Sequence, residues 1–244
     1  MVLDGIYMNI YISIGAQCTT PILFDKLQVK KESLPFDWMF STPEFVYTII
    51  KFLLIDKKEI EDIVDNHFFV CDKRAELHEL ERHVLNENGP VLVNSKYNVC
   101  FPHDIISDRD KYIRRMERFK RILLDKNNFL YFVYVSVSSP NSGNYILDEV
   151  EPIQQLYEYT EKINSIMKHI RTKYKIIIFD TNKPSGVISS DISHMVYYDI
   201  ERKDKWQELL PELIDKYNNL ITNKVINKIF QKSKIRRTRR INKR

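Results

Sequence analysis

Residues 7–27, YMNIYISIGAQCTTPILFDKL, constrain the fold of this chain more than any other stretch. The apolar and β-branched run that ends at Ile14 is typical of a buried strand, and Gly15 interrupts it. A helical spacing of apolar residues then follows, at Ile22, Leu23 and Leu27. A strand that gives way to a helix at a glycine places the residues between them at the carboxyl edge of a sheet. Open α/β sheets bind their ligands at that edge.

Further strand and helix patterns alternate along the chain. Apolar runs at 129–137 and 175–179 predict buried strands, and 194–198 predicts a last one. Helical patterns begin at Pro43, after Ser107 and at Pro152. This order predicts an α/β fold, a mostly parallel sheet with helices on both faces, plus a helical and hairpin insert around 57–102. We expect one α/β domain over residues 1–230, followed by a disordered basic C-terminal tail at 231–244.

The positive charge of the chain is concentrated in that tail. The sequence holds 38 Lys and Arg against 33 Asp and Glu, and eight of the cations lie at 232–244, where there is no acid. Without these eight, the rest of the chain has 30 basic and 33 acidic residues. The charge of the body therefore does not indicate a nucleic-acid-binding surface. The tail is either a solubilising end or, as we expect, a contact for nucleic acid, an acidic protein or an anionic membrane.

Cysteine usage and hydropathy indicate the compartment. Cys18, Cys71 and Cys100 are widely spaced, without a C-x-x-C pair, which favours a reducing compartment and argues against a zinc knuckle. No apolar run reaches the roughly 18 residues of a membrane span. The first residues lack the basic start of a secretory signal. We expect a cytoplasmic protein without a cofactor or metal, whose basic tail offers a route to the nucleus.

Polar loops follow the predicted parallel strands and should meet at one edge of the sheet. They are residues 15–18, 138–141 and 180–182, and His103 is expected to join them from the end of a hairpin predicted at 91–101. Phe36 and Trp38 alternate with Asp37, so we expect the two aromatics to face one way, as core anchors, and the carboxylate the other. The residues expected to contact substrate are Gly15, Gln17, Trp38, Ser138, Asn141 and Asp180.

Cys18 is the candidate nucleophile. A thiol attacks as the thiolate, and the unpaired N–H groups at the start of a helix stabilise that anion. If Pro21 is the first residue of the helix, Thr20 is its cap and Cys18 lies just outside. The alternative role for Cys18 is that of a small buried residue packing the turn.

His103 is the candidate base for that thiol. A cysteine nucleophile needs an imidazole within hydrogen-bond reach and a carboxylate or amide that orients it. Asp104 is adjacent to His103, but neighbouring side chains on an extended chain point apart. Asp37 and Asp180 are therefore equally good orienting groups. A loop histidine bonded to a backbone carbonyl is the alternative.

Three ordered motifs give the chain a family resemblance. They are S-I-G-A-Q-C at 13–18, P-F-D-W at 35–38, and Y-x-V-x-F-x-H-D at 97–104. With these motifs, residues 8–180 resemble a domain of unknown function named as a "putative papain-like cysteine peptidase", found in bacteria and large DNA viruses. The resemblance implies Cys18 as nucleophile and His103 as base, in a host cell if the protein is viral. It leaves Asp37 and Asp104 both open as the third group.

The sequence is consistent with three functions. The first is a thiol hydrolase, peptidase or acyltransferase that acts on a peptide, amide or ester. The second is a transferase that binds a nucleotide or nucleotide sugar on a Rossmann-like sheet, although the single glycine of 13–18 makes a poor phosphate cradle. The third is a non-enzymatic viral adaptor that docks through its tail.

Overall fold

The computed structural model describes residues 8–15, 18–39, 41–68, 73–75, 91–94, 96–97, 99–101, 108–135, 153–171, 173–180, 195–199 and 211–215. The basic tail predicted at 231–244 lies outside these ranges. No helix in the described part of the chain is long and apolar enough to cross a membrane.

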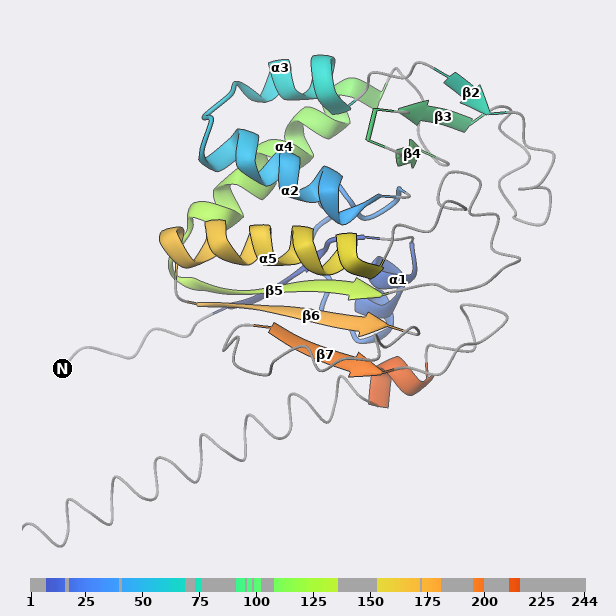
Figure 1. The fold of residues 1–244 in the computed structure, drawn as a ribbon, viewed down its shortest axis with the longest axis vertical. Coiled ribbons are helices and arrows are strands. Elements are labelled where there is room, and N and C mark those ends of the chain that lie inside the picture. The colour runs from blue at the N-terminus through green and yellow to red at the C-terminus, as the bar shows by residue number, and fades with distance from the viewer. Residues whose placement is uncertain are drawn as a thin grey trace, which may run out of the picture.

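The centre of the fold is a four-stranded parallel sheet in the order β1-β5-β6-β7 (Figure 1). Its strands are β1 (Met8–Ser13), β5 (Asn128–Val135), β6 (Tyr174–Asp180) and β7 (Met195–Asp199). Every neighbouring pair is parallel, with Ile12 opposite Phe132 and Phe132 opposite Ile176. The apolar residues of β5 and β6 are buried on both faces, as their continuous runs predict. The predicted parallel α/β sheet is confirmed.

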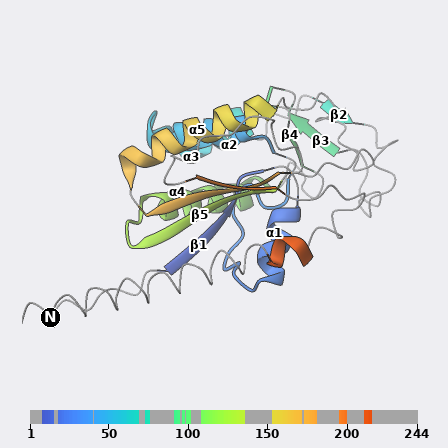
Figure 2. The ribbon, with the colours of Figure 1, turned by 60° about the horizontal axis from the view of Figure 1, so that its bottom comes forward.

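Helices cover both faces of this sheet. One face packs against α2 (Pro43–Leu54), α4 (Arg109–Leu124) and α5 (Ile153–Ile170), and its core holds Ile12, Phe132 and Ile176. The other face packs against α1 (Thr19–Lys26) and a helical turn at 211–215, through Leu23, Phe24 and Leu213. Figure 2 shows α5 and α1 on opposite sides of the sheet. The two cores are the two apolar faces of one sheet.

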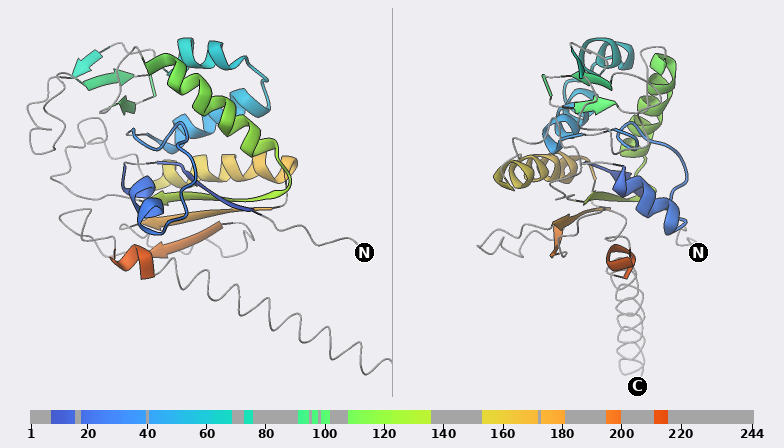
Figure 3. Two further views of the ribbon diagram at one scale, coloured as in Figure 1. Left: turned by 180° about the vertical axis from the view of Figure 1, so that it is seen from behind. Right: turned by 90° about the vertical axis from the view of Figure 1, so that its right-hand side faces the viewer.

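The insert between α2 and α4 forms a separate small layer. It contains α3 (Ile60–Ile63), a π-helical turn η1 (Val64–Phe68), and an antiparallel sheet of β2 (Lys73–Ala75), β3 (Val91–Asn94) and β4 (Val99–Phe101). The predicted hairpin is confirmed by β3 and β4. The strand β2 pairs antiparallel with β3 and so adds a third strand to the hairpin. The small sheet lies toward the end to which the main strands point (Figures 1 and 3).

The start of α2 has the cap that its sequence predicts. Thr42 is extended, and its hydroxyl accepts the N–H of Phe45 at 3.2 Å, while Pro43 occupies the first helical position. The apolar face of the helix is buried as expected, at Phe45, Val46, Ile49, Ile50 and Leu53. A capped and fully packed helix fixes residues 41–45 beside the carboxyl end of β1.

Candidate active site

The turn after β1 is closed by a tight contact at Gly15. Its φ is +151°, a backbone conformation that favours glycine. A Cβ atom there would lie 2.8 Å from Cε2 of Tyr134 and 3.4 Å from the carbonyl oxygen of Ser41. The Thr20 hydroxyl also donates to the Gly15 carbonyl oxygen at 3.4 Å. The turn therefore packs against β5, the entry to α2 and the start of α1 together.

Cys18 is the N-cap residue of α1. It carries a half-buried thiol, and its carbonyl oxygen accepts the Ile22 N–H at 3.0 Å. The case in which Pro21 begins the helix does not apply, because α1 begins at Thr19. Pro21 is tolerated as the third helical residue, since N–H groups of the first turn have no partner within the helix. Cys18 therefore lies directly at the start of the helix, where the dipole acts on it.

Three hydroxyls near this turn are buried without a hydrogen-bond partner among the described residues. They belong to Ser13, Thr19 and Ser41, which are each at most 2% exposed. Ser13 is the last residue of β1, Thr19 begins α1, and Ser41 precedes the α2 cap. A buried polar group without a partner costs about 1–3 kcal/mol. The region around Cys18 therefore holds donors that a ligand or water would satisfy.

Asp37, the third residue of P-F-D-W, is buried among polar groups. Its carboxylate accepts the Leu34 N–H at 2.9 Å and lies 3.6 Å from Nζ of Lys30. Burial raises the pKa of this carboxyl, while Lys30, the Leu34 N–H and Arg115 oppose the rise. Asp37 therefore stabilises the turn at 34–37 through its bond to the Leu34 N–H.

The predicted alternation along P-F-D-W is wrong. Residues 35–38 form a turn and not an extended segment, so successive side chains do not point apart. Phe36 enters the core, with its ring edge-on to Phe119 at 5.4 Å. Trp38 is half-buried, and Nζ of Lys30 lies 4.4 Å from its ring centroid. Asp37 and Trp38 thus contact the same lysine, and only Phe36 is a core anchor.

The first turn of α2 joins the three sequence motifs. The Phe45 ring lies 6.1 Å from Phe36 of P-F-D-W and 5.2 Å from Tyr97 of Y-x-V-x-F-x-H-D. The Thr42 hydroxyl donates to the Tyr97 carbonyl oxygen at 3.3 Å. Ser41 completes the connection through its close approach to Gly15. The sequence analysis missed this role of 41–45, although the cap pattern at Thr42 and Pro43 marked the position.

Of the other predicted site residues, the structure describes only Asp180. Asp180 ends β6, where its backbone pairs with Asp199 of β7 at the carboxyl edge of the sheet, as expected. The remaining predicted site residues lie outside the described residues: Gln17, His103, Asp104, Ser138 and Asn141. Among the described residues no group of three or more His, Cys, Asp or Glu side chains is placed to hold a metal ion.

A cavity of about 490 Å³ lies at the opposite edge of the sheet. Its lining includes Met8 and Asn128, the first residues of β1 and β5, together with Leu34 and Arg121. In a parallel sheet the first residues of the strands lie at the edge opposite to the residues that follow them. This cavity is therefore distinct from the turn that carries Cys18.

Comparison with known proteins places the chain in a family. An uncharacterized protein of Acanthamoeba polyphaga mimivirus is 25% identical over 214 residues, which cover 73% of this chain and 92% of that protein. No solved structure matches the chain. Residues 9–182 match the family described as "Putative papain-like cysteine peptidase (DUF1796)". Because this match spans well over half of the chain and includes the β1 turn, P-F-D-W and Tyr97, the protein belongs to that family.

Proposed function

We propose that the protein is a cysteine hydrolase that cleaves a peptide or a related amide or ester. Sγ of Cys18 attacks the substrate carbonyl carbon, and His103 takes the thiol proton and returns it to the leaving group. Water then cleaves the thioester, with His103 as its base. Backbone N–H groups of the turn at 15–18 stabilise the oxyanion.

The observation that carries this proposal is the position of Cys18 as N-cap of α1. An N-cap residue lies beside N–H groups that have no partner within the helix, and these groups and the dipole favour a negative charge. The thiol is half-buried, and α1 lies near the end of the sheet to which the strands point (Figure 1). This combination of partial exposure and N–H groups lowers the pKa of a cysteine.

The packing around α2 supports His103 as the base. Thr42 fixes the backbone of Tyr97 on the same side of the sheet as the Gly15 turn. β4 ends at Phe101, two residues before His103. The motif that contains His103 is thus tied at its first residue to the segment that packs against the Cys18 turn. Asp37 and Asp104 are both proposed as orienting groups, and Gln17, Trp38, Ser138, Asn141 and Asp180 as substrate contacts.

The strand order favours a hydrolase over a nucleotide-type transferase. Rossmann-like folds bind nucleotides in a crevice where the strand order reverses. Across the described strands the order β1-β5-β6-β7 follows the chain in one direction and does not reverse. The described sheet therefore offers no such crevice.

Covalent labelling tests the proposal. The full-length protein is treated with a peptide that carries a thiol-directed electrophile at its scissile position, and the adduct is mapped by mass spectrometry. We expect one adduct, on Cys18, that Cys18→Ala abolishes and His103→Gln slows. An adduct on Cys71 or Cys100 that persists in Cys18→Ala would overturn the assignment.

The transferase alternative has its own measurement. Thermal unfolding of wild type and Cys18→Ala is followed with nucleotides and nucleotide sugars. We expect nucleotide sugars, which carry no phosphate monoester, to stabilise neither protein. Equal stabilisation of both would favour a transferase in which Cys18 only packs.

A further inference from the structure

Two lysines and an imidazole meet where the insert packs against α2. Lys58 follows α2, His67 lies in the π-helical turn η1, and Lys96 lies in the turn between β3 and β4. Neither lysine has a carboxylate partner among the described residues. Single π-helical turns inside helices are frequently found at functional sites. This group, with Tyr97 and Phe52, is called the Lys58–His67 cluster below.

Two hydrogen bonds join Lys58, His67 and Tyr97. Nζ of Lys58 lies 2.9 Å from Nε2 of His67, and Nδ1 of His67 lies 3.1 Å from the Tyr97 hydroxyl. Because an ammonium group only donates, Nε2 accepts. The neutral ring then carries its hydrogen on Nδ1 and donates it to Tyr97. Tyr97 is buried, so this bond fixes its hydroxyl inside the cluster.

Burial and charge keep this ring neutral. Burial lowers the pKa of His67, Lys58 and Lys96 lower it further, and Asp62 only partly opposes them. The neutral ring can therefore accept the hydrogen bond from Lys58 at Nε2.

Aromatic rings hold the two ammonium groups in place. Nζ of Lys58 lies 4.1 Å from the ring centroid of Phe52, which itself packs 4.5 Å from the His67 ring. Nζ of Lys96 lies 5.1 Å from the ring centroid of Tyr97. Such contacts attract a cation to the ring face without neutralising its charge. Both ammonium groups thus keep N–H donors available.

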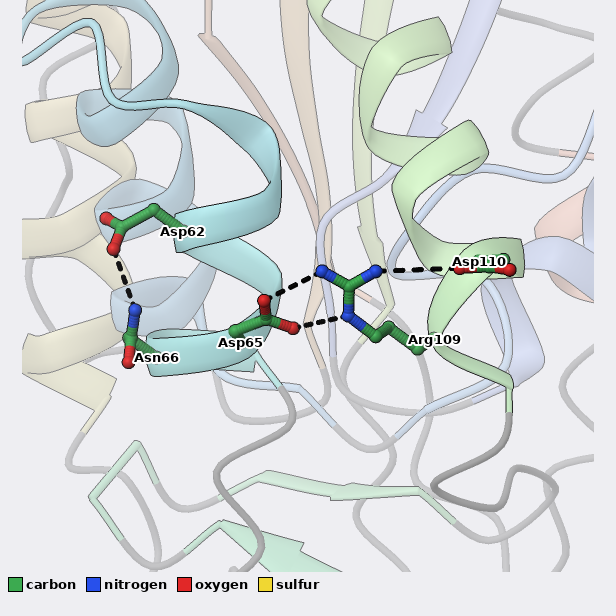
Figure 4. A network of polar contacts seen from close by, with 5 residues as sticks. All are labelled: Asp62, Asp65, Asn66, Arg109 and Asp110. Carbon is green, nitrogen blue, oxygen red and sulfur yellow. Dashed lines mark hydrogen bonds and ion pairs between the residues drawn. The ribbon is translucent and has the colours of Figure 1, made fainter.

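The nearest acids are engaged elsewhere. Asp62 accepts a hydrogen bond from Asn66 at 2.7 Å, and Asp65 accepts two from Arg109, at 2.6 and 2.7 Å (Figure 4). Arg109 also lies 3.5 Å from Asp110. Figure 4 shows these side chains directed toward one another, between η1 and the start of α4. Neither carboxylate makes an ion pair with Lys58 or Lys96, although the charge of Asp62 still acts on His67.

The backbone on both sides of the cluster is fixed. The fully buried Asn94 side chain donates to the His67 carbonyl oxygen at 3.1 Å, and Thr42 donates to the Tyr97 carbonyl oxygen at 3.3 Å. The Asn94 side chain therefore fixes the backbone of His67, and the Thr42 side chain fixes that of Tyr97. The donors of the cluster are held in position before any ligand arrives, which reduces the entropic cost of binding.

We propose that Lys58 and Lys96 bind a phosphate group, with His67 positioning Lys58 and the Tyr97 ring positioning Lys96. The cluster offers donors and two positive charges, so its ligand is an anion that accepts hydrogen bonds. A phosphate monoester carries a charge of about −1.5 to −2 at pH 7 and matches two ammonium groups, whereas a carboxylate matches one. The site is separate from Cys18, and the proposal does not depend on the hydrolase assignment.

Calorimetric titration of the full-length protein at constant ionic strength tests this site. Inorganic phosphate is the first probe, acetate is the monovalent comparison, and phosphoserine and adenosine monophosphate identify the carrier of the phosphate. We expect saturable binding of phosphate, weaker binding of acetate, and tighter binding of one of the two monoesters.

Variants locate the binding. Lys58→Gln and Lys96→Gln should each weaken phosphate binding by about tenfold, because each removes a hydrogen bond between charged groups. Tyr97→Phe should weaken it less. The matched control is Lys168→Gln, an exposed lysine of α5 remote from the insert in sequence, which should bind as wild type does. Circular dichroism confirms that each variant is folded. Absence of saturable binding to the folded wild type, acetate binding as tight as phosphate, or equal loss in Lys168→Gln would overturn the proposal.

Discussion

The Thr42 hydroxyl donates a hydrogen bond to the carbonyl oxygen of Tyr97, 3.3 Å away and 55 positions later in the chain. The hydroxyl oxygen of Thr42 also accepts a hydrogen bond from the Phe45 N–H and so caps α2. One buried side chain therefore fixes both the helix and the segment that leads into β4. Through this contact the motif that contains His103 is attached to the part of the fold that packs against Gly15.

Replacement of Thr42 should destabilise the protein measurably. Thr42→Ala removes the cap and leaves the Tyr97 carbonyl without this donor, so we expect a loss of about 1–2 kcal/mol in the free energy of unfolding. Thr42→Ser keeps the oxygen and should lose much less. Urea denaturation measures both, with Thr48→Ala on the same helix as control. Equal stabilities of Thr42→Ala and Thr42→Ser would show that the hydroxyl does not hold this junction.

Gly15→Ala should cost stability for two separate reasons. A side chain at φ +151° is strained by about 1–3 kcal/mol, and the new Cβ would lie 2.8 Å from the Tyr134 ring. The two causes can be separated in a Tyr134→Ala background, where only the backbone strain remains. We therefore expect Gly15→Ala to cost less in that background than in wild type, by chemical denaturation. A tolerated alanine in wild type would contradict the close approach.

Asp37 gives the stability a defined pH dependence. Burial raises the pKa of its carboxyl above 3.8, so the folded state binds this proton more tightly than the unfolded chain does. The contribution of Asp37 is therefore full below pH 3.8 and is lost as the pH rises through the raised pKa. Asp37→Asn should remove this slope and match or exceed wild type at neutral pH. Urea denaturation across pH tests the sign: wild type should lose stability relative to Asp37→Asn as the pH rises from 4 to 7, and a relative gain would contradict it.

His67 should titrate below the ordinary histidine range. Burial and the two lysines lower its pKa from 6.5, so its neutral form contributes stability that is present above pH 6.5 and lost as the pH falls through the lowered pKa. Lys58→Gln removes a neighbouring positive charge and should raise that pKa. An NMR titration of the ring protons measures both proteins. A wild-type midpoint at or above 6.5, unchanged in Lys58→Gln, would contradict the arrangement of the cluster.

Hydrophobic patterning predicted most of the main sheet. The apolar runs at 129–137 and 175–179 correspond to β5 and β6, because strands buried on both faces need apolar residues at consecutive positions. The Thr42-Pro43 cap was equally clear, since it depends on neighbours in sequence. The start of α1 stayed open in the sequence, because Pro21 is compatible with several positions in a first turn.

The environment of the site could be predicted only in part. Gly15 and Cys18 were expected in the turn after β1, and both lie there. The burial of Asp37 could not be predicted, because its partners are Lys30 from the segment after α1 and Arg115 from α4. The same holds for His67, whose partners Lys58 and Tyr97 lie in separate segments. Contacts between distant segments depend on packing and not on local sequence.

The rate of Cys18 alkylation as a function of pH tests the central claim most directly. The protein is pulsed with iodoacetamide from acid to alkaline pH, and the peptide that contains Cys18 is quantified by mass spectrometry, in wild type and in His103→Gln. If Cys18 is a nucleophile at the start of α1 with His103 beside it, the midpoint lies below the value of about 8.5 of an ordinary thiol. The His103→Gln variant then shifts it upward. A midpoint at or above that value, the same in both proteins, would contradict the account.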